Sequence, residues 1–217
     1  MRPSLFSFMK EYGMLKRTAI GIALAVMAVE AAPALAQDAP ASAATQQQAG
    51  AFVNKLANDA FAILRDKSVS QTAAKTRFRA MLRDNFALDE AGLRLIRRYR
   101  ATLTPAQLSA YRSALPDFLV NTYSDRLYDF SSSKVTVVRT APRGSRGDVD
   151  VYTAVSDPKG GKPIDAIWTV KTSGPRPLVQ NLTVNGVNVA LTQEADFSSY
   201  IDKNGFDALV TFMKQAK

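Results

Sequence analysis

The apolar residues of this 217-residue chain change their spacing near Ser131, and this change constrains the fold more than any other feature. Before it they recur at intervals of three and four residues, which is typical of helices, and after it they alternate, which is typical of strands. Helices, then strands, then helices indicate an α+β fold with helices packed on one face of a strongly twisted antiparallel sheet. We expect one domain at 51–217, with a helical part at 51–130, a sheet part of about four strands at 131–192 and C-terminal helices at 193–217.

Two local patterns in the helical part indicate where a helix begins and where it bends or restarts. The run Thr104-Pro105-Ala106-Gln107 combines a threonine N-cap, a proline in the first turn and a glutamine three residues on, so we expect a helix to begin there. Pro116 lies further along the same apolar pattern. Because proline removes a backbone hydrogen bond from a helix, we expect the segment to bend or restart at that point.

The sheet part shows alternation and turn chemistry. The run DVDVYTAV at 148–155 alternates valines with polar and aromatic residues, which predicts one buried and one exposed face. The Pro- and Gly-containing cluster at 157–161 predicts the turn of a hairpin. We expect one long final strand at 178–189, with Gly186 indicating a bulge or bend.

The first 36 residues predict export. A short apolar run, TAIGIALAVMAV at 18–29, follows basic residues, and Ala34-Leu35-Ala36 offers the small side chains that a signal peptidase accepts. The run is well short of the roughly 20 residues that a membrane-spanning helix needs. We therefore expect a signal peptide at 1–36, cleaved after Ala36, and a disordered tether at 37–50 that is rich in Ala, Gln and Pro.

The sequence offers few groups for catalysis. It contains no cysteine and no histidine, which removes the thiolate nucleophile and the commonest general base and metal ligand. No motif of a hydrolase, a zinc protease or a phosphate-binding loop is present. We expect no enzymatic activity, no metal and no cofactor. One alternative stays open, in which Asp165, with Tyr152 or Tyr123, acts as the general base of an isomerase-like enzyme.

The chain is basic, with a formal net charge of +9. Arg94, Arg97 and Arg98 fall at the spacing of one helix face and predict a basic rim for phosphate headgroups or an acidic partner. An ordinary solvated helix face is the alternative. Export argues against nucleic acid as the partner.

Five segments follow one another in a recognisable order. They are Phe118-Leu119-Val120-Asn121-Thr122-Tyr123 with Leu127-Tyr128, Pro163-Ile164-Asp165-Ala166-Ile167-Trp168-Thr169-Val170, Val184-Asn185-Gly186-Val187-Asn188, Thr192-Gln193-Glu194-Ala195-Asp196-Phe197, and Asn204-Gly205 before a short terminal helix. Their order and spacing, together with the leader, resemble the MlaC family of periplasmic phospholipid carriers, also called toluene-tolerance proteins. The resemblance covers residues 51–217.

Four positions depart from the pattern of that family. Asn181 and Asn185 replace acids, Asn188 replaces a common serine, and Glu194 stands where arginine is usual. These departures bear on partner docking and headgroup preference rather than on the fold. They leave a diverged paralogue, linked to hopanoids or another lipid, as an alternative.

The resemblance implies an NTF2-like, MlaC-like fold with an apolar cavity between helices and sheet. It implies a periplasmic, monomeric carrier whose cargo is a phospholipid and which maintains outer-membrane lipid asymmetry. The implied partners are an inner-membrane ABC transporter complex and an outer-membrane lipoprotein–porin complex. Periodicity and resemblance together predict acyl-chain contact by Phe78, Leu82, Phe86, Ile96, Leu115, Phe118, Leu119, Tyr123, Leu127, Tyr152, Trp168, Val170, Leu182, Val184, Val187 and Phe197. A periplasmic protein-binding or chaperone module is the second alternative, and it predicts a filled core.

Overall fold

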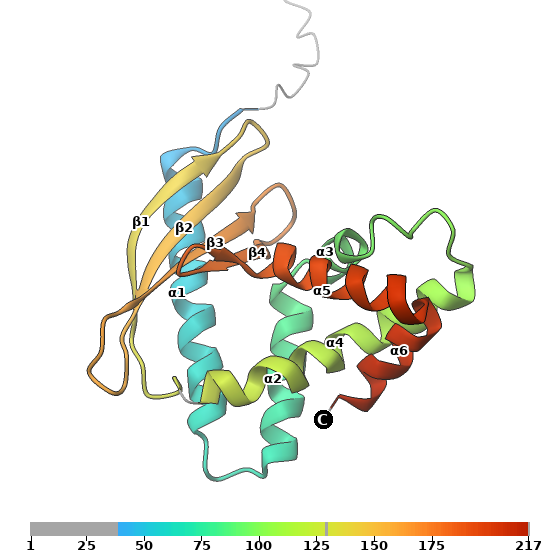
Figure 1. Cartoon of the computed structure of the whole chain (residues 1–217). Helices are drawn as coiled ribbons and strands as arrows, with labels where there is room; N and C mark the ends of the chain where they lie inside the picture. The colour runs from blue at the N-terminus through green and yellow to red at the C-terminus, as the bar shows by residue number, and fades with distance from the viewer. Residues whose placement is uncertain (1–38, 129, 217) are drawn as a thin grey trace, which may run out of the picture. The chain divides into compact units, whose positions relative to one another are not determined.

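The computed structural model describes residues 39–128 and 130–216. In these residues six helices and five strands occur in the order α1–α4, β1–β5, α5 and α6 (Figure 1). The predicted α+β class, with helices packed on an open antiparallel sheet, is confirmed. The predicted signal peptide at 1–36 lies outside the described residues. Within the described part, no helix has the length and apolar character needed to cross a membrane.

Helix α1, Ala43–Arg65, begins earlier than expected. The prediction of a disordered tether at 37–50 is wrong from residue 43 onward, because Ser42 caps the helix and the following Ala and Gln residues favour it. Gly50 shows why the extra turns are held in place: a Cβ on Gly50 would lie 3.3 Å from Cγ2 of Thr140, so α1 lies close against the sheet there.

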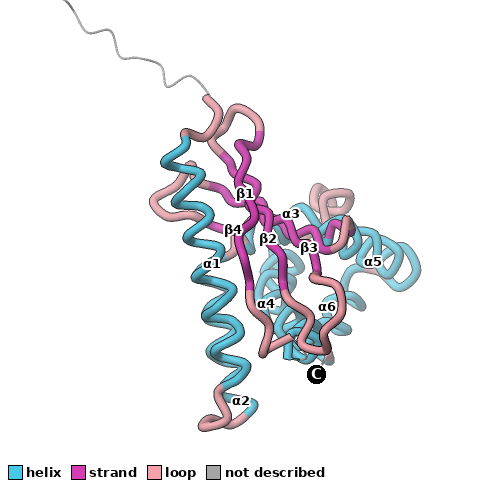
Figure 2. Tube along the Cα trace, turned by 90° about the vertical axis from the view of Figure 1, so that its left-hand side faces the viewer, coloured by secondary structure: helices cyan, strands magenta, loops and turns pink. Residues whose placement is uncertain are grey.

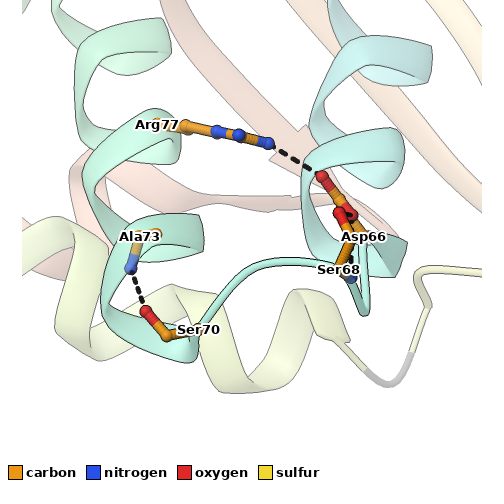
Figure 3. A network of polar contacts seen from close by, with 5 residues as sticks. All are labelled: Asp66, Ser68, Ser70, Ala73 and Arg77. Carbon is orange, nitrogen blue, oxygen red and sulfur yellow. Dashed lines mark hydrogen bonds and ion pairs between the residues drawn. The ribbon is translucent and has the colours of Figure 1, made fainter.

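A short polar turn joins α1 to α2, Gln71–Asn85. Asp66 accepts a hydrogen bond from the Ser68 hydroxyl and another from Arg77 Nη1 at 2.8 Å, while the Ser70 side chain caps α2 (Figure 3). The bond from Ser68 lowers the pKa of Asp66. These contacts set the return path of α2 along α1.

Helices α3, Leu88–Leu95, and α4, Pro105–Tyr128, follow. The predicted capping box is confirmed, because Gln107 N donates to Thr104 Oγ1 at 3.2 Å and Thr104 N donates to Gln107 Oε1 at 3.1 Å. The expected restart at Pro116 is wrong: α4 is one helix that continues through it. Buried apolar side chains on both sides of the proline anchor the helix to its neighbours.

The sheet is an antiparallel meander with the strands in chain order. Its strands are β1 Val135–Arg143, β2 Asp148–Val155, β3 Ile164–Lys171, β4 Leu178–Val184 and β5 Val187–Asn188. The single strand predicted at 178–189 is wrong. Asn185 and Gly186 have φ values of 47° and 79° and form a two-residue turn between β4 and β5, so the bend expected at Gly186 is present and divides the strand.

Two helices end the described chain, α5 Val189–Asn204 and α6 Phe206–Gln215. The first begins four residues before the predicted 193, because the Asn188 side chain accepts a hydrogen bond from a first-turn amide. Helix α1 runs alongside the sheet (Figure 2) and packs on β1 and β2. Helices α2, α3 and α5 contact β4.

Buried apolar residues form four separate clusters. Cluster A joins α3, α4, α5 and α6; cluster B joins α1 to β2 and β3; cluster C joins the C-terminal half of α1 to β1; and cluster D joins α2 to α4. In cluster B, Val149 and Val151 are fully buried, which confirms the buried face that the alternation on β2 predicts.

Candidate functional site

Three apolar side chains connect the four clusters, and each is only partly buried. Leu119 packs on clusters A and D, Leu127 on clusters C and D, and Trp168 on clusters B and C. A single filled core would bury the residues at its centre completely. Here the residues where clusters meet keep accessible apolar surface, and these three positions define the candidate site, which we call the junction.

Two elements position the junction. Leu119 and Leu127 are eight residues apart on α4 and therefore lie on one face of the helix. Trp168 lies directly opposite Leu182 across the β3–β4 pair, and Ala166 lies opposite Val184. Directly paired residues share a face of the sheet, so Leu182 and Val184 extend the apolar surface of Trp168.

The polar edge of Trp168 is satisfied within the sheet. Its indole Nε1 donates to Oγ1 of Thr153 at 3.0 Å, and Thr153, itself 2% exposed, donates to the carbonyl oxygen of Ala166 at 3.4 Å. The indole therefore needs no polar partner from solvent or a ligand, and its remaining surface is apolar.

The sixteen residues predicted to contact acyl chains fall into three groups. The buried ones are Phe78, Leu82, Ile96, Leu115, Phe118, Val170 and Phe197. The partly buried ones are Phe86, Leu119, Tyr123, Leu127, Tyr152, Trp168, Leu182 and Val184, and Val187 is exposed. The first group packs within the clusters, and most of the second surrounds the junction.

Two of the sixteen do not join the others. Tyr152 pairs with Ile167, on the sheet face opposite to Trp168, and its ring lies 3.3 Å from the Arg139 guanidinium. Val187 is 56% exposed on β5. The β2–β3 register, which pairs Val151 with Trp168 and Tyr152 with Ile167, therefore places the Tyr152 and Trp168 side chains on opposite faces of the sheet. Acyl-chain contact by the sixteen residues stays a prediction.

Two partly buried residues beside the junction were missed. Ile63 of α1 and Met81 of α2 pack on cluster D with Leu119 and Leu127. Both lie on the apolar stripes of their helices, so the helical spacing of apolar residues was sufficient to include them among the predicted contacts. Gln193, 8% exposed on α5, was also missed, and it accepts a hydrogen bond from the Tyr123 hydroxyl at 3.2 Å.

The predicted basic rim lies partly in an open groove of about 800 Å³ between the α3–α4 turn and α5. Arg97 pairs with Glu194 at 2.6 Å, and Arg98 Nη1 lies 3.6 Å from Asp202. Arg94 is exposed on α3 and does not line the groove. Because α3 ends at Leu95, the three arginines do not share one helix face, and acids neutralise two of them.

The departures from the family pattern have local explanations at two positions. Asn185 adopts the left-handed conformation of the β4–β5 turn, which asparagine tolerates, and its Oδ1 accepts a hydrogen bond from the Asp165 amide at 3.1 Å. Glu194 is the buried partner of Arg97. Asn181 faces the same side as Thr169, and its Oδ1 is buried with no hydrogen-bond partner among the described residues.

The isomerase alternative depends on Asp165. Asp165 is exposed on β3, whereas a carboxylate that acts as a tuned general base is normally enclosed in an apolar pocket. Among residues 39–128 and 130–216, no group of three or more carboxylates is placed to hold a metal ion.

The chain is similar to known proteins in sequence and in fold. A family model described as "MlaC protein" matches residues 54–215. The fold is similar to the solved structure of a phospholipid-binding protein from Ralstonia solanacearum in complex with a phospholipid. That likeness has a TM-score of 0.67 at 18% sequence identity and covers 78% of this chain and 96% of the other.

Proposed function

This chain belongs to the MlaC family, and from that membership we propose that it binds a phospholipid, shields the acyl chains at the junction and carries the lipid between membranes. The Ralstonia protein of the same fold binds a phospholipid, which supports this cargo. The observation that carries the proposal is the set of partly exposed apolar side chains, Leu119, Leu127 and Trp168, at the points where the four clusters meet.

Transfer energetics explain why a carrier needs such a surface. Each CH₂ group exposed to water costs about 0.8 kcal/mol, so two bare acyl chains cannot cross an aqueous compartment at a useful rate. Apolar side chains that keep accessible surface in the apo protein lose it on contact with a tail. In a completely filled core, no apolar surface would remain accessible for an acyl chain to contact.

The proposal also covers the cellular compartment and the protein partners. With a leader at 1–36 the protein acts in the periplasm, where it exchanges lipid with an inner-membrane ABC transporter complex and an outer-membrane lipoprotein–porin complex. Neither loading nor unloading requires a nucleophile, a base or a metal, so we propose no catalytic step. A hopanoid or another lipid as cargo is the alternative that lipid identification decides.

A charged residue at the junction tests the proposal. Leu119→Asp places a carboxylate against the tails, and Leu191→Asp, at a position 57% exposed on α5, is the matched control. We expect Leu119→Asp to lose at least tenfold in bound phospholipid while Leu191→Asp keeps the wild-type amount, with circular dichroism confirming that both fold. Equal lipid in both variants would contradict the proposal.

A further inference from the structure

A second, more enclosed cleft of about 500 Å³ lies where the end of α2, the start of α3, α4 and the start of β4 meet. Its apolar lining includes Phe86, Leu115 and Leu178, and three arginines line it as well: Arg83, Arg112 and Arg176. Apolar and cationic groups are therefore adjacent in one cavity, which is the pairing that an anionic amphiphile requires.

Helices α3 and α4 are closely packed at the side of this cleft lined by Tyr111 and Gly92. Tyr111 is fully buried, and its hydroxyl donates to the carbonyl oxygen of Gly92 at 2.9 Å. A Cβ on Gly92 would lie 2.6 Å from Cδ2 of Leu115, so α3 and α4 are in close contact there. A ligand thus meets the apolar lining and the arginines, because the hydroxyl on this side is already used.

The arginines of the cleft keep positive charge that acids do not cancel. Arg176 Nη1 donates to the backbone carbonyl of Asp84, a neutral acceptor, and Arg83 makes no ion pair among the described residues. The closest approach of Arg112 to a carboxylate is 3.9 Å, to the largely exposed Asp89.

The acids of the cleft do not offset this surplus. Two acids line the cleft opposite the three arginines: Glu90 is engaged by Lys171 from β3, and Asp89 lies 3.9 Å from Arg112. In the groove beside α5, Glu194 and Asp202 pair with Arg97 and Arg98, and Lys203 also lines the groove. What distinguishes the cleft is that Arg83 and Arg176 have no carboxylate partner among the described residues, so both are available to an anion.

The cleft also adjoins the apolar site. Phe86 lines the cleft and packs on cluster D, and Leu115 lines the cleft and belongs to cluster A. Leu119, the junction residue that touches both of these clusters, lies one helical turn after Leu115 on α4. A lipid whose tails lie at the junction can therefore place its headgroup at the cleft.

We propose that this cleft binds the phosphate of the cargo lipid's headgroup through Arg83 and Arg176, with Arg112 at its rim. The inference rests on the proposed function and deepens it, because it assigns the selection of phosphate-containing lipids to the cleft. Guanidinium groups bind phosphate through paired, charge-assisted hydrogen bonds, so the arginines select phospholipids over uncharged lipids with the same tails.

The test compares two double variants. Arg83→Gln/Arg176→Gln removes two charges from the cleft, and Arg65→Gln/Arg100→Gln removes two exposed charges outside it. Binding of phosphatidylglycerol, phosphatidylethanolamine and a diacylglycerol with identical chains is measured for each protein. We expect the wild type and the control to prefer both phospholipids over diacylglycerol by about tenfold or more, and the cleft variant to lose that preference.

Each other outcome has a defined meaning. A cleft variant that keeps the wild-type preference overturns the headgroup site while lipid binding itself stands. Competition by inorganic phosphate as strong as that by phospholipid makes the cleft a general anion site and also overturns it. A wild type that binds none of the three lipids refutes the proposed function instead. If the double variant fails to fold, the single variant Arg83→Gln, changed at an exposed position, is compared with the wild type for binding of the same three lipids.

Discussion

Trp168 and Thr153 are joined across neighbouring strands by a hydrogen bond of 3.0 Å from the indole Nε1 to the hydroxyl oxygen. This bond fixes the ring of the only tryptophan in the chain beside clusters B and C, with its polar edge turned into the sheet. Trp168 is therefore both part of the junction and a built-in fluorescent reporter of it.

The first prediction uses that reporter. Phospholipids with bromine atoms on the acyl chains should quench Trp168 fluorescence, because bromine quenches on contact and the proposed function places the tails against the indole. Unbrominated lipid with the same headgroup is the control and should leave the intensity largely unchanged. Bound brominated lipid without quenching would place the tails elsewhere in the protein.

The second prediction concerns Thr153. Thr153→Val should lower the free energy of unfolding by about 1–3 kcal/mol, because it leaves the indole N–H without its partner in a largely buried setting. Urea unfolding followed by fluorescence measures the loss. Thr136→Val on β1, where the side chain is exposed, is the matched control and should change the free energy by less than about 0.5 kcal/mol. Equal effects would show that the Trp168–Thr153 bond contributes nothing.

The third prediction is a pH dependence. Burial raises the pKa of Tyr111 well above its usual value near 10. In the unfolded chain this tyrosine ionises near pH 10 whereas in the folded chain it stays protonated, so its stability contribution is complete below about pH 10 and is lost as the pH rises further. Thermal unfolding from neutral pH to about pH 11 should show a falling Tm.

Tyr111→Phe separates this effect from the titration of other groups. The variant should lose about 1 kcal/mol at neutral pH, since it lacks the hydrogen bond to the Gly92 carbonyl. Above pH 10 its Tm should fall less steeply than that of the wild type. Parallel curves for the two proteins would show that Tyr111 does not govern the alkaline transition.

Periodicity and capping chemistry predicted much of the fold. The capping box at Thr104 and the buried valines Val149 and Val151 followed directly from local patterns, because each depends on residues close in sequence. The early start of α1 did not, because residues 43–50 carry no large apolar side chain and are held by contact with a strand 90 residues later. The turn at Asn185 and Gly186 was predictable, since Asn-Gly is the strongest two-residue hairpin pattern.

The site was harder to predict than the fold. Spacing indicates which side chains point inward, but it does not distinguish a filled core from four clusters with accessible junctions. Phe118 and Leu119 are neighbours in sequence, yet the first is buried in cluster A and the second connects two clusters. Helical spacing predicted a rim at Arg97 and Arg98, which pair with Glu194 and Asp202 in the structure. Spacing does not show which acids lie nearby in space, and the surplus charge of Arg83 and Arg176 depends on that.

Native mass spectrometry of the mature protein, purified from its own periplasm without detergent and followed by lipid extraction, tests the central claim most directly. We predict phospholipid bound at near-stoichiometric occupancy, with the extract identifying the headgroup and the chains. A protein that carries only its own mass, and that gains none after incubation with phospholipid vesicles, would contradict the carrier function and favour a protein-binding role.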